Sequence, residues 1–295
     1  MPFDPFQSYL PAGAMLLFLS GSVMAQNLAP QASQVLTPFG YRDKATVHQV
    51  PEGYNLNRMP DGHFRMENLS TGDHIDFSGP TASEKGTTPL PENGWITGIN
   101  WYNQTGKPVS RFSTNWRVPR PPQTYTGQTL FLFNGIEPAS FDTILQPVLQ
   151  YGGSAAGGGT YWAVASWYVT GTTSFVSQLV KVSTGQLLTG RMGLVSHTNA
   201  EFCYSCEFKG IAGTNLSIKN IAQLFWCVET LEVYGVNQCS DFPNTPFTKF
   251  SQINIQNEGT VPSMNWTIGN NQTACGVQTT IVTDGALNAT ADVYY

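Results

Sequence analysis

Residues 223–234 read QLFWCVETLEVY, a stretch rich in the aromatic and β-branched residues that favour strands. Successive side chains of a strand point to opposite faces of its sheet, so Glu229 and Glu232 are predicted to face opposite ways. A carboxylate on such an apolar strand face is either hydrogen-bonded within the fold or held for catalysis. This segment therefore sets both the expected fold and the first candidate site.

Similar segments recur along the chain after residue 95, separated by turns such as Gly152-Gly153 and Thr184-Gly185. No helical periodicity extends beyond about two turns. Many short strands of this kind predict an all-β, double-sheet β-sandwich of the jelly-roll type. The expected strands are 109–118, 128–136, 144–151, 160–169, 176–182, 187–195, 200–208, 215–219, 223–234, 247–255, 278–283 and 290–294.

The N-terminal third has a different organisation. Leu10 to Ala25 is apolar and ends in a small-x-small pattern, which predicts a secretory signal peptide over residues 1–25. Residues 26 to about 40 are interpreted as a linker, and 45–77 as a small hairpin unit. The segment 26–94 is then either a propeptide removed on maturation or a permanently attached subdomain, and 95–295 is the sandwich domain.

Composition and cysteines favour a secreted, extracellular, monomeric protein. The net charge of −5 and a charged fraction of 11% provide no basic face for nucleic acid or an anionic membrane. Five cysteines in an oxidising compartment suggest one or two disulfides, and we expect Cys239 to pair with Cys275. Six sequons predict N-glycosylation, at Asn68, Asn103, Asn215, Asn265, Asn271 and Asn288.

Several kinds of chemistry are disfavoured by what the sequence lacks. His197 is the only histidine after residue 94, and no motif around it would orient it as the base of a serine or cysteine triad. Cys203 and Cys206 have the CxxC spacing, but no second pair or nearby histidines complete a zinc site. We therefore expect no metal and no cofactor.

Four ordered parts of the sequence resemble the eqolisin, or glutamic-peptidase, family of acid peptidases. The resemblance covers roughly residues 100–270. It rests on Asn100-Trp101 with Phe112–Pro119 (FSTNWRVP), on Gly135-Ile136 with Ile144-Leu145-Gln146, on Ala165–Tyr168 (ASWY), and on Val228–Glu232 (VETLE) followed by Phe247–Phe250 (FTKF). It implies a concanavalin-like double-sheet sandwich that hydrolyses polypeptides at acidic pH.

Carried onto this sequence, the resemblance implies a catalytic pair of Gln146 and Glu229. Glu229 would act as general base on a water, and the Gln146 amide would stabilise the oxyanion. Gln150 is an alternative donor on the same strand face, and Glu232 competes with Glu229 because a one-residue slip reverses the faces. The implied substrate contacts are Trp116, Trp162, Trp167 and Tyr168.

The residue after Gln146 qualifies this hypothesis. Pro147 follows Gln146 and lacks a backbone N–H, so its strand is expected to bulge or to lie at a sheet edge.

Two other functions also remain open. One is a non-catalytic sandwich that binds glycans or surfaces through aromatic residues, with a Ca²⁺ site if it is of the lectin type. The other is a polysaccharide hydrolase, which the opposite facing of Glu229 and Glu232 disfavours.

Overall fold

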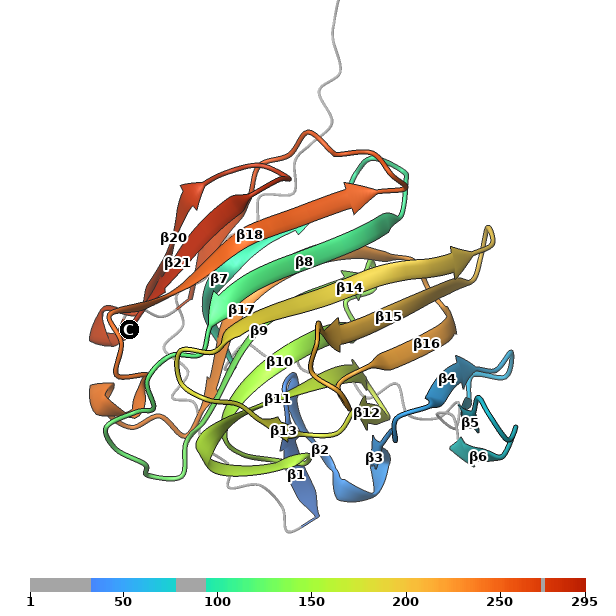
Figure 1. The fold of residues 1–295 in the computed structure, drawn as a ribbon, viewed down its shortest axis with the longest axis horizontal. Coiled ribbons are helices and arrows are strands. Elements are labelled where there is room, and N and C mark those ends of the chain that lie inside the picture. Colours follow the sequence, from blue (N-terminus) through green and yellow to red (C-terminus); the bar gives the residue numbers. More distant parts are fainter. Residues whose placement is uncertain (1–32, 78–93, 272–273) are drawn as a thin grey trace, which may run out of the picture.

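The computed structural model describes residues 33–77, 94–271 and 274–295. Two large twisted sheets pack face to face, and the helical elements among these residues are single 3₁₀ turns, η1 (Lys44–Thr46), η2 (Cys239–Asp241) and η3 (Ala274–Gly276) (Figure 1). The predicted all-β sandwich is confirmed. The predicted signal peptide and the boundary at 78–93 lie outside the described residues.

The first sheet carries the candidate catalytic strands at its centre. Its strands follow the order β19 (Thr267–Asn270), β7 (Trp95–Tyr102), β17 (Leu224–Tyr234), β9 (Thr129–Pro138), β10 (Thr143–Ser154), β11 (Gly157–Thr170), β12 (Ser174–Val176) and β3 (Val47–Gln49), and β13 (Val180–Lys181) also pairs with β11. Strand β9 thus separates β17 from β10, and long side chains on one face of these strands can meet.

The second sheet lies in front of the first in Figure 1. Its order is β20 (Gln278–Thr283), β21 (Ala289–Tyr294), β18 (Phe247–Asn257), β8 (Val109–Arg117), β14 (Leu187–His197), β15 (Phe202–Phe208), β16 (Leu216–Ile221), β4 (Tyr54–Arg58), β5 (Phe64–Asn68) and β6 (His74–Phe77). Burying a large apolar side chain contributes about 1.5–3 kcal/mol. The layer between the sheets, which includes Phe112, Leu132, Tyr204 and Phe250, is therefore the main source of stability.

A second apolar layer lies on the outer face of the first sheet. Phe131, Phe133 and Val148 belong to it, and it is covered by a hairpin made of β1 (Gln34–Thr37) and β2 (Gly40–Asp43). We call residues 34–43 the covering hairpin. Its two strands pair with each other and form a separate two-stranded sheet.

The rest of the N-terminal segment is built into the sandwich. Strand β3 lies parallel to β12 at the edge of the first sheet, and β4 lies parallel to β16 in the second. Leu56, Phe64 and Met66 are buried in the main core. Residues 47–77 therefore complete both sheets, whereas the covering hairpin only rests on one of them.

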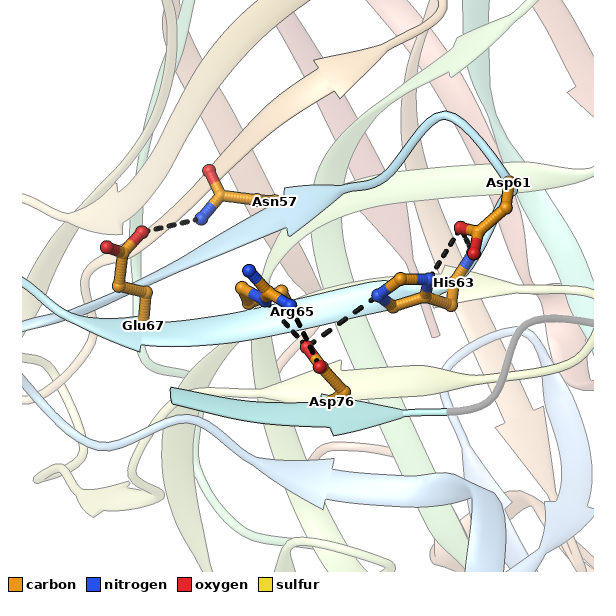
Figure 2. A network of polar contacts seen from close by, with 6 residues as sticks. All are labelled: Asn57, Asp61, His63, Arg65, Glu67 and Asp76. Atoms are coloured by element: carbon orange, nitrogen blue, oxygen red, sulfur yellow. Dashed lines mark hydrogen bonds and ion pairs between the residues drawn. The ribbon is translucent and has the colours of Figure 1, made fainter. Parts of the chain in front are cut away.

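Charged side chains decorate the exposed side of β4–β6. Asp76 accepts from Arg65 at 2.7 and 2.9 Å, and His63 lies between Asp76 and Asp61 (Figure 2). Exposed ion pairs of this kind contribute about 0–1 kcal/mol each. The buried Phe64 side chain, rather than this network, therefore holds the hairpins to the domain.

Two local predictions about the strand after Thr143 differ from the structure. The Gly152-Gly153 turn is wrong: β10 continues through a bulge to Ser154, and the chain reverses at Ala155-Ala156. The bulge or edge position predicted from Pro147 is also not found, because β10 is central and its register with β9 is the same on both sides of Pro147. The missing N–H of Pro147 is accommodated where the pairing between β9 and β10 skips Gln146 and Pro147.

The predicted disulfide is confirmed, with Cys239 and Cys275 joined across 36 residues. Of the sequon asparagines, Asn215, Asn265, Asn271 and Asn288 are exposed and Asn68 is half-buried. Asn103 is different, because it is 1% exposed and its Nδ2 donates to the Lys107 carbonyl. The folded protein leaves no space for a glycan at Asn103. No helix among the described residues is long and apolar enough to cross a membrane.

Candidate functional site

The structure does not bring Gln146 and Glu229 together. Their side chains leave opposite faces of the first sheet: Gln146 Nε2 donates to the Pro38 carbonyl of the covering hairpin at 2.7 Å, whereas Glu229 accepts from the Thr114 hydroxyl of the other sheet. The register explains this separation. Val228, not Glu229, pairs with Gly135, and the unshifted register between β9 and β10 sets Gln146 opposite Gly135, on the Val228 face.

Glu229 is enclosed between the two sheets. It is 1% exposed, and burial raises the pKa of its carboxyl well above the ordinary value despite the opposing bond from Thr114. Its Oε2 has no hydrogen-bond partner. This environment favours the neutral form of the Glu229 carboxyl, and its bond to Thr114 directs it toward the other sheet, away from the face that carries Gln146.

The other sequence-predicted site residues are also mostly structural. Trp116, Trp162 and Tyr168 are buried in the core between the sheets, so the interpretation of these three as substrate contacts needs correction. Trp167 lies on the outer face beneath the covering hairpin. The Gln150 amide donates to the carbonyls of Gly152 and Gly157 and is used within its own hairpin.

Glu232 lies on the same outer face as Gln146. Its Oε1 accepts from the backbone N–H of Phe39 at 3.0 Å and from the Tyr234 hydroxyl at 2.5 Å. Gln146 binds the carbonyl oxygen of Pro38, the residue before Phe39. The two side chains therefore hold the two polar ends of one peptide bond, the amide between Pro38 and Phe39.

The tip of the covering hairpin is shaped for this contact. Thr37 and Gly40 pair across a two-residue turn, and the Thr37 hydroxyl donates to the Gly40 carbonyl at 2.7 Å. Phe39 has a φ of 121°, a conformation that residues other than glycine rarely adopt. Backbone in such a region persists where its surroundings hold it, and here Glu232 and the packing of the Phe39 ring do so.

Polar atoms without partners gather at the same place. Buried polar groups are normally hydrogen-bonded, and an orphaned one costs about 1–3 kcal/mol. On the outer face of the first sheet and the hairpin that covers it, the buried atoms without a partner include Arg42 Nη2, Glu137 Oε1, Gln146 Oε1, Trp167 Nε1 and Ser174 Oγ. This surface retains hydrogen-bonding capacity that the hairpin does not use.

Desolvation by the covering hairpin and the sheet shifts the pKa values of the ionisable groups at this site. Burial raises the pKa of Glu232 to about 7, although the hydrogen bonds from Tyr234 and from the Phe39 N–H oppose the rise. Burial likewise lowers the pKa of Arg42, whose Nε donates to the Thr170 carbonyl and whose guanidinium lies 5.8 Å from the Phe39 ring centre.

An open cavity continues from the covered site. It has a volume of about 200 Å³, and its lining includes Trp95, Asn100 and Trp226. The Trp95 and Trp226 rings are 6.1 Å apart, and Trp226 Nε1 donates to Asn100 Oδ1 at 3.2 Å. Trp95 also packs edge-on against Phe39 at 6.3 Å, so the cavity and the hairpin tip share one wall.

Comparisons with known proteins add a structural likeness. SCP-B, a member of the eqolisin family of peptidases solved with the tripeptide Ala-Ile-His, is 13% identical and matches with a TM-score of 0.43 over 69% of this chain and 98% of its own. No protein-family model matches the chain, and no curated protein matches it. The function therefore has to be argued from the site itself.

The described residues contain no group of three or more His, Cys, Asp and Glu side chains that would hold a metal ion. His197 lies 2.9 Å from Glu258, and both are partly exposed. The pair of polar side chains on the peptide bond of the covering hairpin is thus the arrangement with a recognisable chemical use.

Proposed function

We propose that the protein is a secreted endopeptidase that works at acidic pH with Gln146 and Glu232 as its catalytic pair. The observation that carries the proposal is the arrangement around the Pro38–Phe39 amide, with Gln146 on its carbonyl oxygen and Glu232 on its N–H. Glu232 takes the role that the sequence motif assigned to Glu229, because the register places Glu232 on the Gln146 face.

The chemistry is a hydrolysis in two steps. Ionised Glu232 takes a proton from a water, and the water oxygen bonds to the carbonyl carbon of the substrate while the carbonyl electrons move to its oxygen. The Gln146 amide donates to that oxyanion, a contribution of about 10²–10³ in rate. Glu232 then returns the proton to the amide nitrogen, the carbon–nitrogen bond breaks, and an acid and an amine leave.

The acidic working range follows from the environment of Glu232. A general base must be ionised, and under the hairpin burial raises its pKa to about 7. When water and substrate replace the hairpin, the desolvation decreases, while the Tyr234 hydroxyl still stabilises the ionised form. The pKa of the uncovered group then moves back towards the ordinary value for a glutamate, which lets it act as a base in acid.

The test compares two glutamates of one strand. Protein digestion is measured from about pH 2 to 6 on the full chain and on the same chain carrying Phe39→Ala, which removes the ring beside Trp95. Glu232→Gln should lower kcat/KM by about 10²–10⁴ and Gln146→Ala by about 10²–10³. Glu229→Gln is the matched control and should retain the activity. Addition of an aspartic-peptidase inhibitor should leave the activity unchanged.

Two results would overturn the assignment. Undiminished digestion by Glu232→Gln would remove Glu232 from the chemistry. Loss of activity in Glu229→Gln with retention in Glu232→Gln would restore Glu229 as the base. Circular dichroism of each variant separates a catalytic loss from a failure to fold.

The cavity between Trp95 and Trp226 favours a second candidate, a sandwich that binds glycans by stacking sugar rings on these indoles. It would be supported by saturable quenching of tryptophan fluorescence by an oligosaccharide, reduced in Trp226→Ala, in a protein that digests nothing. Proteolysis that depends on Glu232 decides against it.

A further inference from the structure

The covering hairpin fills the site as completely as a tight ligand would. Leu36 is 9% and Phe39 5% exposed, and beneath the hairpin Gln146 and Glu232 are 0% exposed. A polypeptide from solution cannot reach either side chain while the hairpin is in place. A peptidase with this structure is therefore closed.

We infer that the covering hairpin, residues 34–43, is a built-in inhibitor that occupies the Gln146–Glu232 site as a substrate-like peptide. This inference rests on the proposed function and adds its regulation. The hairpin makes the contacts expected of a substrate at the bond to be cut: its carbonyl oxygen is on the amide donor and its N–H is on the carboxylate.

The bound amide is held in an unreactive pose. Glu232 accepts from the Phe39 N–H, so its Oε1 lies near the plane of the peptide and next to the nitrogen. Attack on a carbonyl carbon comes from above that plane, from a water held by the carboxylate. Oε1 is engaged by the N–H and by Tyr234, and the whole side chain is 0% exposed, so no water from solution reaches the carboxylate in this pose. The hairpin therefore binds without being cut.

The inhibitor is separable from the rest of the N-terminal segment. Besides the site contacts, the hairpin is held by the Ala155 N–H on the Leu36 carbonyl at 2.7 Å and by Arg42 on the Thr170 carbonyl. Neither of its strands joins a large sheet. The connection to β3 is the short turn at Lys44–Thr46, where Lys44 and Ala45 are exposed. The hairpin can therefore swing away on this turn while β3–β6 stay in their sheets.

The experiment first weakens the packing of the covering hairpin in the full chain and then adds the hairpin sequence as a separate synthetic peptide. Phe39→Ala removes the ring buried against Trp95, and we expect kcat/KM for a peptide substrate to rise about tenfold or more. A synthetic peptide of residues 34–43 (QVLTPFGYRD) should then bind the variant and inhibit it competitively, and the same peptide with alanine at position 39 should bind at least about tenfold more weakly. Lys44→Ala, an exposed change just outside the hairpin, is the control and should behave as wild type.

Peptide binding, measured by calorimetry, keeps this inference separate from the proposed function. Binding without proteolysis in any variant keeps the hairpin as the natural occupant of the site and overturns the peptidase. Proteolysis that Phe39→Ala does not raise, with no binding of the peptide, overturns the inhibitor and keeps the peptidase. If Phe39→Ala does not fold, Arg42→Gln, which removes the guanidinium contact to Thr170, takes its place in the same comparison.

Discussion

Glu229 and Glu232 belong to one strand, lie three residues apart and have very different surroundings. Glu229 faces the other sheet and bonds to Thr114, inside a core that completes the fold. Glu232 faces outward, beside Tyr234, and is covered there by a hairpin that joins neither large sheet. Burial raises the pKa of both carboxyls. The comparison teaches that a buried carboxyl becomes a candidate for catalysis when its cover can move.

The largest expected effect that tests this comparison is on stability against pH. Burial raises the pKa of Glu137 to about 8, of Glu232 to about 7 and of Glu229 well above its ordinary value. A carboxyl whose folded pKa exceeds its unfolded pKa contributes stability that is complete below about pH 4 and is lost as the pH rises through the folded value. We expect the free energy of unfolding, from urea titrations, to fall by several kcal/mol between about pH 4 and pH 8.

Single substitutions show which carboxyl groups cause this dependence of stability on pH. Glu229→Gln and Glu232→Gln should each flatten the curve, because a neutral amide replaces a group that must stay protonated. A free energy of unfolding that rises from pH 4 to pH 8 would contradict the raised pKa values of these carboxyls.

Replacing each of the two glutamates by alanine should lower the free energy of unfolding by different amounts. Glu229→Ala leaves a cavity between the sheets and deprives Thr114 of its acceptor, so the free energy of unfolding should fall by about 2–4 kcal/mol. Glu232→Ala mainly loosens the covering hairpin and should cost about 1 kcal/mol. Denaturant unfolding at pH 4 measures both, and equal losses would mean that the hairpin is as integral to the fold as the core.

The smallest expected effect concerns Tyr234, which donates to Glu232 at 2.5 Å. This bond lowers the pKa of Glu232, so Tyr234→Phe should raise that pKa and move the acid limb of the kcat/KM profile up by about 0.5–1 pH unit. Tyr41→Phe, on the exposed side of the hairpin, is the control. A profile that does not move would show that the tyrosine does not position the base.

Local sequence patterns predicted the strands well. The segments expected at 109–118 and 247–255 correspond to Val109–Arg117 and Phe247–Asn257, because alternation and turn residues are properties of neighbouring positions. The opposite facing of Glu229 and Glu232 is confirmed for the same reason. It depends only on the period of an extended chain.

Which glutamate lies on the same sheet face as Gln146 depends on the register between neighbouring strands. Local sequence patterns do not determine that register. Which glutamate shares the face of Gln146 is decided by how β9 aligns with both neighbours, and a shift of one residue reverses the answer. Trp116 and Trp162 illustrate the same limit, because an aromatic side chain suits a core as well as a cleft. The covering hairpin was interpreted as linker, although Pro38 and Gly40 between Leu36 and Tyr41 were a usable turn signal.

The position of the covering hairpin in the chain has a consequence for biosynthesis. Residues 34–43 leave the ribosome long before Gln146, and Glu232 is among the last parts of the first sheet to be made. The covering hairpin is thus synthesised before the strands that carry Gln146 and Glu232. For the proposed peptidase, this order means that the covering hairpin is already present to shield the site when the site folds.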